Sequence, residues 1–135
     1  MIQDAGYRIA KTKSYRDLDI FVLSKDLAVK IHRQTLEELP KYEMYEEGSQ
    51  IRRSSKSIVS NIVEGFGRRR YKNEFIQFLT YAVASCDETK VHLEMLHLTG
   101  SLRKEFFEEL LAGYNELCAK LFKFRESVIK NHRVS

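Results

Sequence analysis

The chain has 135 residues, of which 43% are hydrophobic and 31% charged, with six glycines, one proline and no tryptophan. This length and composition suit one domain with a buried core, and they exclude a disordered tail and a many-turned β-sandwich or barrel. The net charge of +4 is unevenly spread: residues 49–72 carry seven basic and one acidic side chain (+6), while residues 1–48 and 73–135 each carry eight basic and nine acidic ones (−1).

The composition also bears on location. No stretch approaches the ~20 apolar residues that cross a bilayer, and the first residues lack the apolar run of a signal peptide. Two cysteines, Cys86 and Cys118, are too few for a disulfide scaffold. We therefore expect a cytoplasmic protein with reduced thiols and no membrane association.

Residues 1–14 are predicted to form a flexible N-terminal arm, and residues 15–135 a single domain. The first helix is predicted over residues 17–38, where apolar side chains recur at helical spacing. The expected buried stripe consists of Leu18, Phe21, Ala28, Ile31 and Leu36. Asp17 is available to cap the start of this helix, and Pro40 ends it, because the residue before a proline avoids helical geometry.

A second helix is predicted over residues 45–67, with a buried face of Ile51, Ser55, Ile58, Ile62 and Phe66. It is unusually rich in small polar side chains, namely Ser49, Ser54, Ser55, Ser57, Ser60 and Asn61. Serine is a poor helix former, so this concentration needs a reason. Close packing of a neighbouring helix is the favoured interpretation, and a polar surface for a ligand or second subunit is the alternative. Glu64 shares a face with Asn61 and is expected to pair with Arg68, Lys56 or another chain.

Two further helices are predicted over residues 73–98 and from residue 101 or 104 to residue 130, with Gly100 ending the first of them. Their expected buried residues are Phe75, Phe78, Leu79, Ala82, Cys86, Thr89, Leu93 and Leu96, then Phe106, Leu110, Leu111, Tyr114, Leu117, Cys118, Leu121, Phe122 and Val128. Four long helices joined by short loops predict an all-α fold, an antiparallel up-and-down four-helix bundle.

The two cysteines are expected at the same level of this bundle. Cys86 and Cys118 are equally distant along the chain from a turn near residue 102. The favoured interpretation is two small buried core residues, since free cysteine is among the most buried residue types. A redox or metal-binding pair is the alternative.

The middle of the chain carries a specific resemblance. The run QIRRSSKSIVSNIVEGFGR (residues 50–68), followed by NEFIQFL (residues 73–79), resembles the S23-type four-helix-bundle proteins, often encoded within intervening sequences of bacterial 23S rRNA genes. The family signature, QxRRAAxSIPSNIAEGxGR and then KEFxxFL, matches at Gln50, Arg52, Arg53, Ser57, Ile58, Ser60, Asn61, Ile62, Glu64, Gly65, Gly67, Arg68, Glu74, Phe75, Phe78 and Leu79. YRDLDIF (residues 15–21) and LPKYEMY (residues 39–45) resemble the family's opening helix and first loop.

The chain departs from the family pattern at a few positions. Val59 replaces the usual proline, Val63 an alanine, and Glu46 and Glu47 a common Gly-Leu pair. Without the proline, the second helix is expected to be straighter and fully hydrogen-bonded. The resemblance implies an antiparallel bundle that assembles as a homo-oligomer, commonly a pentameric ring, with no established enzyme activity. Related bundle proteins are accessory factors of diversity-generating retroelements, where a basic surface engages nucleic acid, but this analogy is remoter.

Binding of RNA or DNA is the first functional hypothesis. The candidate residues are Arg52, Arg53, Lys56, Arg68, Arg69, Arg70 and Lys72, which would contact phosphates in a salt-dependent, weakly sequence-specific way. Arg52 and Arg53 belong to the signature and favour a structural role, whereas Arg69 and Arg70 lie beyond it and favour an external ligand.

The alternative is an oligomeric scaffold that binds a protein partner, in which the basic residues serve a solvated face and ion pairs between subunits. The candidate subunit contacts or structural polar residues are Ser57, Ser60, Asn61 and Glu64. The sequence does not separate this hypothesis from nucleic-acid binding.

Metal-dependent catalysis is disfavoured by motif counting. A di-iron bundle needs two Glu-x-x-His motifs, and the chain has one, Glu94 to His97. Catalytic triads, phosphate loops and Cys-x-x-Cys motifs are missing as well. We therefore expect no enzyme activity, no cofactor and no metal.

Overall fold

The computed structural model describes residues 14–131, which contain four α-helices, two short 3-10 turns and no strand. In chain order the elements are η3 (Tyr15–Asp17), α2 (Asp19–Glu38), η4 (Lys41–Glu43), α3 (Glu47–Gly67), α4 (Lys72–Leu98) and α5 (Lys104–Asn131). The all-α prediction is confirmed, and each predicted helix lies within a few residues of its expected bounds. The predicted N-terminal arm, apart from Ser14, falls outside the described residues.

The ends of the first long helix follow local chemistry, with one correction. Asp17 does not cap α2, because it belongs to η3, and Leu18 occupies the cap position without a side-chain bond. Ser14 caps η3 instead, its hydroxyl accepting from the Arg16 backbone N–H at 3.1 Å. At the other end Leu39 has extended backbone angles (φ −76°, ψ 148°), so the predicted stop at Pro40 is confirmed.

The turn between α4 and α5 depends on one glycine. Gly100 has a φ of +81°, a left-handed conformation that costs glycine little. This geometry lets the backbone N–H of Ser101 bond to the Leu96 carbonyl at 2.9 Å, which closes the C-terminus of α4. The predicted end of the third helix at this glycine is confirmed.

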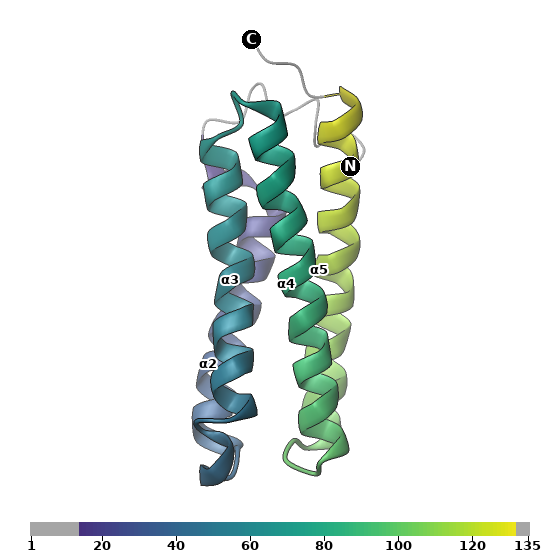
Figure 1. Cartoon of the computed structure of the whole chain (residues 1–135). Helices are drawn as coiled ribbons and strands as arrows, with labels where there is room; N and C mark the ends of the chain where they lie inside the picture. The colour runs from purple at the N-terminus through teal and green to yellow at the C-terminus, as the bar shows by residue number, and fades with distance from the viewer. Residues whose placement is uncertain (1–13, 132–135) are drawn as a thin grey trace.

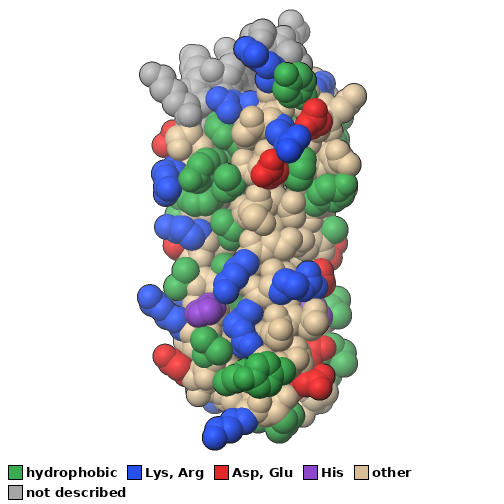
Figure 2. Space-filling view, turned by 60° about the vertical axis from the view of Figure 1, so that its left-hand side comes forward, with side chains coloured by type: hydrophobic (Ala, Val, Ile, Leu, Met, Phe, Trp, Pro, Cys, Tyr) green, Lys and Arg blue, Asp and Glu red, His purple; other side chains and the backbone are tan. Residues whose placement is uncertain are grey.

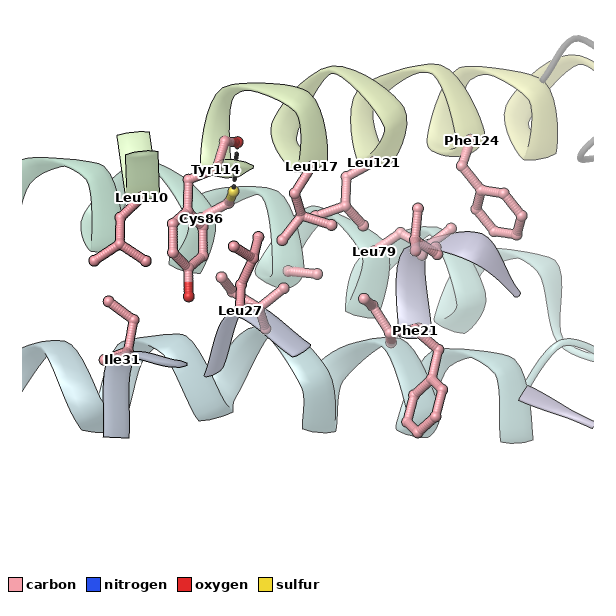
Figure 3. Close-up of a cluster of buried hydrophobic side chains, with 14 of the residues drawn as sticks. Phe21, Leu27, Ile31, Leu79, Cys86, Leu110, Tyr114, Leu117, Leu121 and Phe124 are labelled. Carbon is pink, nitrogen blue, oxygen red and sulfur yellow. Dashed lines mark hydrogen bonds between the residues drawn. The ribbon is translucent and has the colours of Figure 1, made fainter. Parts of the chain in front are cut away.

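Figure 1 shows the four helices side by side, with successive helices running in opposite directions. α3 lies between α2 and α4, and α5 packs against α4 and α2. Their facing sides bury one continuous hydrophobic core (Figure 3), whose largest fully buried side chains are Tyr114, Phe75, Ile31, Ile51, Ile58, Ile62, Leu79, Leu93, Leu96, Leu110 and Leu117. The apolar stripes predicted from spacing therefore describe most of this core.

Two residues of the predicted stripes are exposed. Leu36 is 44% exposed, and Thr35 is buried in its place, because Thr35 follows Ile31 by one helical turn. Phe122 is 50% exposed, and Phe124 is buried instead, three residues after Leu121. In each helix the exposed residue lies one position after the residue that continues the buried i, i+4 spacing.

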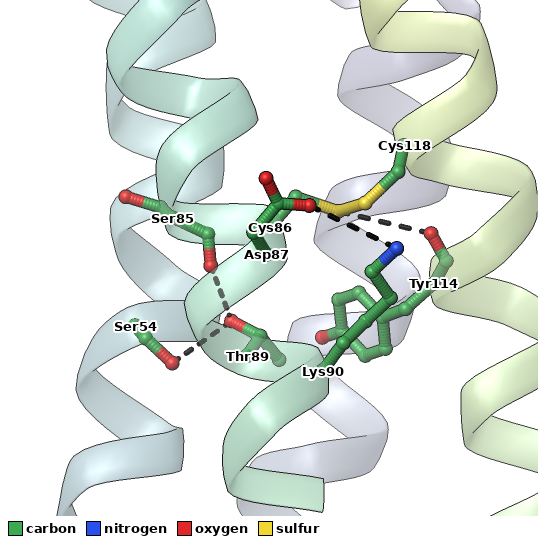
Figure 4. The surroundings of a disulfide bond; sticks show 8 residues. All are labelled: Ser54, Ser85, Cys86, Asp87, Thr89, Lys90, Tyr114 and Cys118. Atoms are coloured by element: carbon green, nitrogen blue, oxygen red, sulfur yellow. Dashed lines mark hydrogen bonds and ion pairs between the residues drawn. A yellow bond between two sulfur atoms is a disulfide. The ribbon is translucent and has the colours of Figure 1, made fainter.

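The expectation of reduced thiols is wrong in this structure. Cys86 and Cys118 form a disulfide that joins the middle of α4 to the middle of α5 (Figure 4), with a Cα–Cα separation of 6.1 Å. The prediction that the two cysteines share a level in the bundle is confirmed, and their Cα–Cα separation lies in the usual range for a disulfide.

Tyr114 lies beside this disulfide and is completely buried. Its carbonyl oxygen is 3.7 Å from the Cys86 sulfur. Burial raises the pKa of the Tyr114 phenol, because the anion would lose its hydration, and the nearby Ser55 hydroxyl offsets part of this effect.

Candidate nucleic-acid interface

The basic segment predicted from the sequence spans α3 and the turn into α4, and the structure does not make it one patch. Lys56 and Arg68 are separated by twelve helical residues, or about 18 Å along the axis. The segment therefore divides into a group in the first half of α3 and a group at its C-terminal end. Within each group the side chains differ in what they contact.

Arg52 is used inside the chain. Its Nη1 donates to the Thr35 hydroxyl at 3.1 Å, and its Nη2 donates to the Met44 carbonyl oxygen. These bonds tie α3 to the end of α2 and to the loop between them. This geometry agrees with the structural role expected for the arginine pair of the signature.

Arg53 belongs to a chain of charged contacts between α3 and α4. Its guanidinium lies 2.8 Å from a Glu88 carboxylate oxygen. The same Glu88 oxygen is 3.3 Å from Nε2 of His92, whose Nδ1 is 2.6 Å from a Glu47 oxygen. Both ring nitrogens of His92 face carboxylates, so the ring holds Glu88 and Glu47 together between α3 and α4. Arg53 is therefore also engaged within the chain.

In the C-terminal group, Arg68 and Arg69 both make contacts within the chain. Arg68 pairs with Glu64 at 2.9 Å and Glu74 at 2.7 Å, and hydrogen bonds to Glu74 and Glu64 raise the pKa of its guanidinium. Arg69, expected to face an external ligand, packs over the Phe66 ring at 4.0 Å and donates to the Phe66 carbonyl at 3.0 Å. Its position after the helix end folds it back onto the last turn.

The side chains of the remaining two cations of this group make no hydrogen bond or ion pair with another described residue. Arg70, predicted to be free for an external ligand, is exposed, and Lys72 is half-buried. They form a small basic corner where α3 turns into α4.

Lys56 faces a different surface, a groove between α2 and α3. Its Nζ lies 3.1 Å from Nδ1 of His32 on α2. The groove, called the α2–α3 groove below, has a volume of about 550 Å³ and is lined by Lys25, Ala28, Val29, His32, Arg33, Lys56, Val59 and Ser60. Figure 2 shows Lys and Arg side chains gathered around a histidine on this face.

The charged side chains that line the α2–α3 groove are all cationic. Lys25, Arg33 and Lys56 are cationic donors, and none of the described residues lining the groove carries a carboxylate. Outside the lining, the Asp26 carboxylate lies 3.8 Å from Lys25, with both side chains exposed, so it neutralises Lys25 only weakly. Such a lining is suited to a ligand that supplies negative charge and hydrogen-bond acceptors.

Sequence reasoning missed the three polar α2 residues of this groove, Lys25, His32 and Arg33. A signal was present, because these residues recur at steps of seven and eight along one face of the helix. The net charge of this part of the chain did not reveal the basic face, because the nine acidic side chains of residues 1–48 offset the eight basic ones in the sum. The packing of α2 on α3 brings these residues beside Lys56 in a groove whose lining contains none of those acids.

The predicted small polar residues find partners within the chain. Ser57 contacts Ser85 of α4 through the two hydroxyls at 3.0 Å and accepts from the Asn61 amide at 3.1 Å. Ser54 likewise meets Thr89 at 2.8 Å (Figure 4). Ser60 lines the α2–α3 groove, and Glu64 is exposed and paired with Arg68 as described. The close-packing interpretation holds for the α4-facing serines.

Two further structural features bear on function. No group of three His, Cys, Asp or Glu residues in the described part of the chain could hold a metal ion. None of the helices described is long and apolar enough to cross a membrane.

Comparison with known proteins places this bundle in a family. Residues 16–123 match the model of a family described as 23S rRNA-intervening sequence protein. The chain is also similar to the crystal structure of a protein with unknown function from the S23 ribosomal protein family of Bacteroides thetaiotaomicron, with 25% identity and a TM-score of 0.73 over 79% of this chain and 95% of that one. No curated protein matches the chain. The resemblance seen in the signature is confirmed: the chain belongs to the 23S rRNA-intervening sequence protein family.

Proposed function

We propose that this member of the 23S rRNA-intervening sequence protein family is a non-enzymatic, self-assembling helical bundle that binds the backbone of RNA or DNA through the basic face of α2 and α3. The observation that supports the proposal is the α2–α3 groove, which gathers Lys25, Arg33 and Lys56 with no acidic side chain in its described lining. Arg70 and Lys72 extend the basic character at the far end of α3.

The physical basis is counterion release. Each phosphate that a lysine or arginine neutralises releases condensed cations, so binding weakens as salt rises. Three groove cations predict a log–log salt slope of about −2 on a single strand, from ~0.7 per contact. Affinity of one subunit is expected to be weak, and an assembly would repeat the groove and add avidity.

The test is fluorescence anisotropy of a labelled oligonucleotide titrated with the full chain between 50 and 200 mM salt. The charge-reversal variant Arg33→Glu/Lys56→Glu is expected to weaken binding at least tenfold. The matched control is Lys104→Glu/Lys123→Glu, two exposed lysines of α5 with the same change in net charge, expected to stay within about twofold. If both variants weaken binding equally, the net charge of the protein explains the effect and the groove does not, which contradicts the proposal. If the groove variant binds as tightly as the wild type, the proposal is also overturned.

Self-assembly, and with it the scaffold alternative, is favoured by a separate observation. Two helices expose apolar side chains outside the α2–α3 groove: Val22 and Leu36 on α2, 43% and 44% exposed, and Val91, Met95 and Leu98 on α4, from 42% to 77% exposed. The three residues of α4 are spaced by four and three positions and so share one helix face, and an exposed apolar patch of this kind marks an interaction surface. The family resemblance favours a pentamer, which for a 15.9 kDa chain would have a mass of 5 × 15.9, about 80 kDa.

Light scattering after size exclusion tests the assembly. The wild-type mass is expected to be a multiple of the chain mass, and Val22→Asp or Leu98→Asp is expected to lower it. Ala112→Asp, at an exposed position of α5, is the control and is expected to leave the mass unchanged. A monomer at micromolar concentration would contradict self-assembly. Assembly without any oligonucleotide binding would leave the protein-scaffold alternative.

A further inference from the structure

We infer that the α2–α3 groove accepts an unpaired nucleic-acid strand in preference to a duplex, an inference that rests on the proposed backbone binding. The groove combines two features that a duplex cannot use together. Its rim is cationic, and its floor is apolar, formed by Ala28, Val29 and Val59.

The apolar floor is the part that discriminates. Val29 is 42% exposed in the free chain, so its side chain is available to a ligand. An unpaired nucleotide offers a base face and a sugar face beside its phosphate, whereas a duplex hides its base faces and presents mainly its phosphate backbone. Covering Val29 and Val59 with a base or sugar removes apolar surface from water, a gain that a phosphate alone cannot supply.

The arrangement of the cations suits a strand that runs along the groove. Lys25 and Arg33 are eight residues apart on α2, or about 12 Å along its axis, with Val29 midway between them. Lys56 reaches the same floor from α3. Cations thus flank the apolar floor at both ends and on one side, which lets phosphates lie at the rim while a base covers the valine.

The width of the groove works against a duplex. Two packed helices have axes about 8–10 Å apart, and a double helix is much wider than the depression between them. A duplex would therefore touch only the outer cations. A flexible strand can enter and reach the floor.

His32 adds a hydrogen-bond donor to the lining of the groove. The Lys56 ammonium carries only donors, so the His32 Nδ1 at 3.1 Å must accept, and the ring proton lies on Nε2. The Nε2–H can then donate to a phosphate or to a base carbonyl oxygen. The three cations and this N–H are all donors, which an acceptor-rich strand satisfies.

The experiment compares a labelled 12-nucleotide mixed-sequence RNA strand with the blunt duplex of the same sequence, using the full chain at 100 mM salt. The single strand is expected to bind at least tenfold more tightly. Val29→Ser removes floor area without changing charge and is expected to weaken strand binding about threefold to tenfold while leaving duplex binding unchanged. Val29→Phe enlarges the floor and is expected to tighten strand binding.

Ile129→Ser is the matched control, because it replaces a 40% exposed aliphatic side chain of α5 that lies outside the groove lining and outside the apolar residues proposed for assembly. It is expected to affect neither ligand, and circular dichroism checks that all variants keep their helix content. Duplex binding equal to strand binding, or Val29 variants that behave like wild type, would overturn this inference. If Arg33→Glu/Lys56→Glu still abolished binding in that case, the backbone-binding proposal would stand. If neither ligand bound, both would fall.

Discussion

The disulfide between Cys86 and Cys118 gives the sharpest prediction about stability. The bond closes a loop with a sequence separation of 32 residues. In the chain-entropy description this cross-link removes about 3.7 kcal/mol of loop-closure free energy from the unfolded state. A chain of 135 residues unfolds with an entropy of about 0.28 kcal/mol per kelvin, taking ~2.1 cal/mol/K per residue. Reduction is therefore expected to lower Tm by about 13 °C.

The assay is thermal and urea unfolding of the oxidised and the fully reduced chain at one fixed protein concentration, since assembly makes Tm concentration-dependent. Thiol titration in denaturant confirms each redox state. The control is Cys86→Ala/Cys118→Ala, whose Tm is expected not to respond to reductant, which separates loss of the bond from other effects of the reductant. A Tm shift below about 3 °C on reduction, or two free thiols in the chain purified without reductant, would refute the reasoning.

Three further predictions concern the packing and the charges of the bundle. Gly48→Ala is expected to lower the free energy of unfolding in urea by about 1–3 kcal/mol, because the new Cβ would clash with the backbone oxygen of Glu43. Gly67→Ala is the control: open space surrounds this position, so the same change is expected to be neutral or stabilising. His92→Ala is expected to cost about 1–3 kcal/mol, because it leaves the half-buried carboxylate of Glu47 without its 2.6 Å partner; unchanged urea stability would contradict the network. Burial raises the pKa of Tyr114, so the stability that this group contributes is complete below the ordinary tyrosine pKa of about 10 and is lost as pH rises above it. Circular dichroism of unfolding at alkaline pH tests this: Tyr114→Phe is expected to remove this part of the loss of stability.

Much of the bundle follows from short-range rules. Spacing of three and four residues marks the buried faces, Pro40 stops α2, and Gly100 stops α4. The errors arise where two residues compete for one register position, as at Leu36 and Phe122, because the neighbouring helix decides which side chain is covered. A helix start is also decided by neighbours: Asp17 can cap a helix, but the chain forms a short 3-10 turn there, capped by Ser14.

The disulfide and the groove depend on relations between helices, which a linear pattern describes only in part. Equal distances from the α4–α5 turn predict that Cys86 and Cys118 share a level, but bond formation also requires their Cβ atoms to point at each other. In the same way, His32 and Lys56 are 24 residues apart and meet only because α2 and α3 pack side by side. Spacing along α2 alone shows a mixed surface of basic and apolar residues.

The net charge of the basic segment overstates the number of cations that are free to bind a ligand. Residues 49–72 hold a net +6, yet Arg52, Arg53, Arg68 and Arg69 make contacts within the chain that hold helices or helix ends together. If all seven basic residues of the segment met phosphates, the salt slope on a single strand would be about −5, from ~0.7 per contact. Three groove cations give about −2, and two of these, Lys25 and Arg33, lie outside the segment. The measured slope therefore tests whether charge density along the chain or the packing of α2 on α3 determines the binding surface.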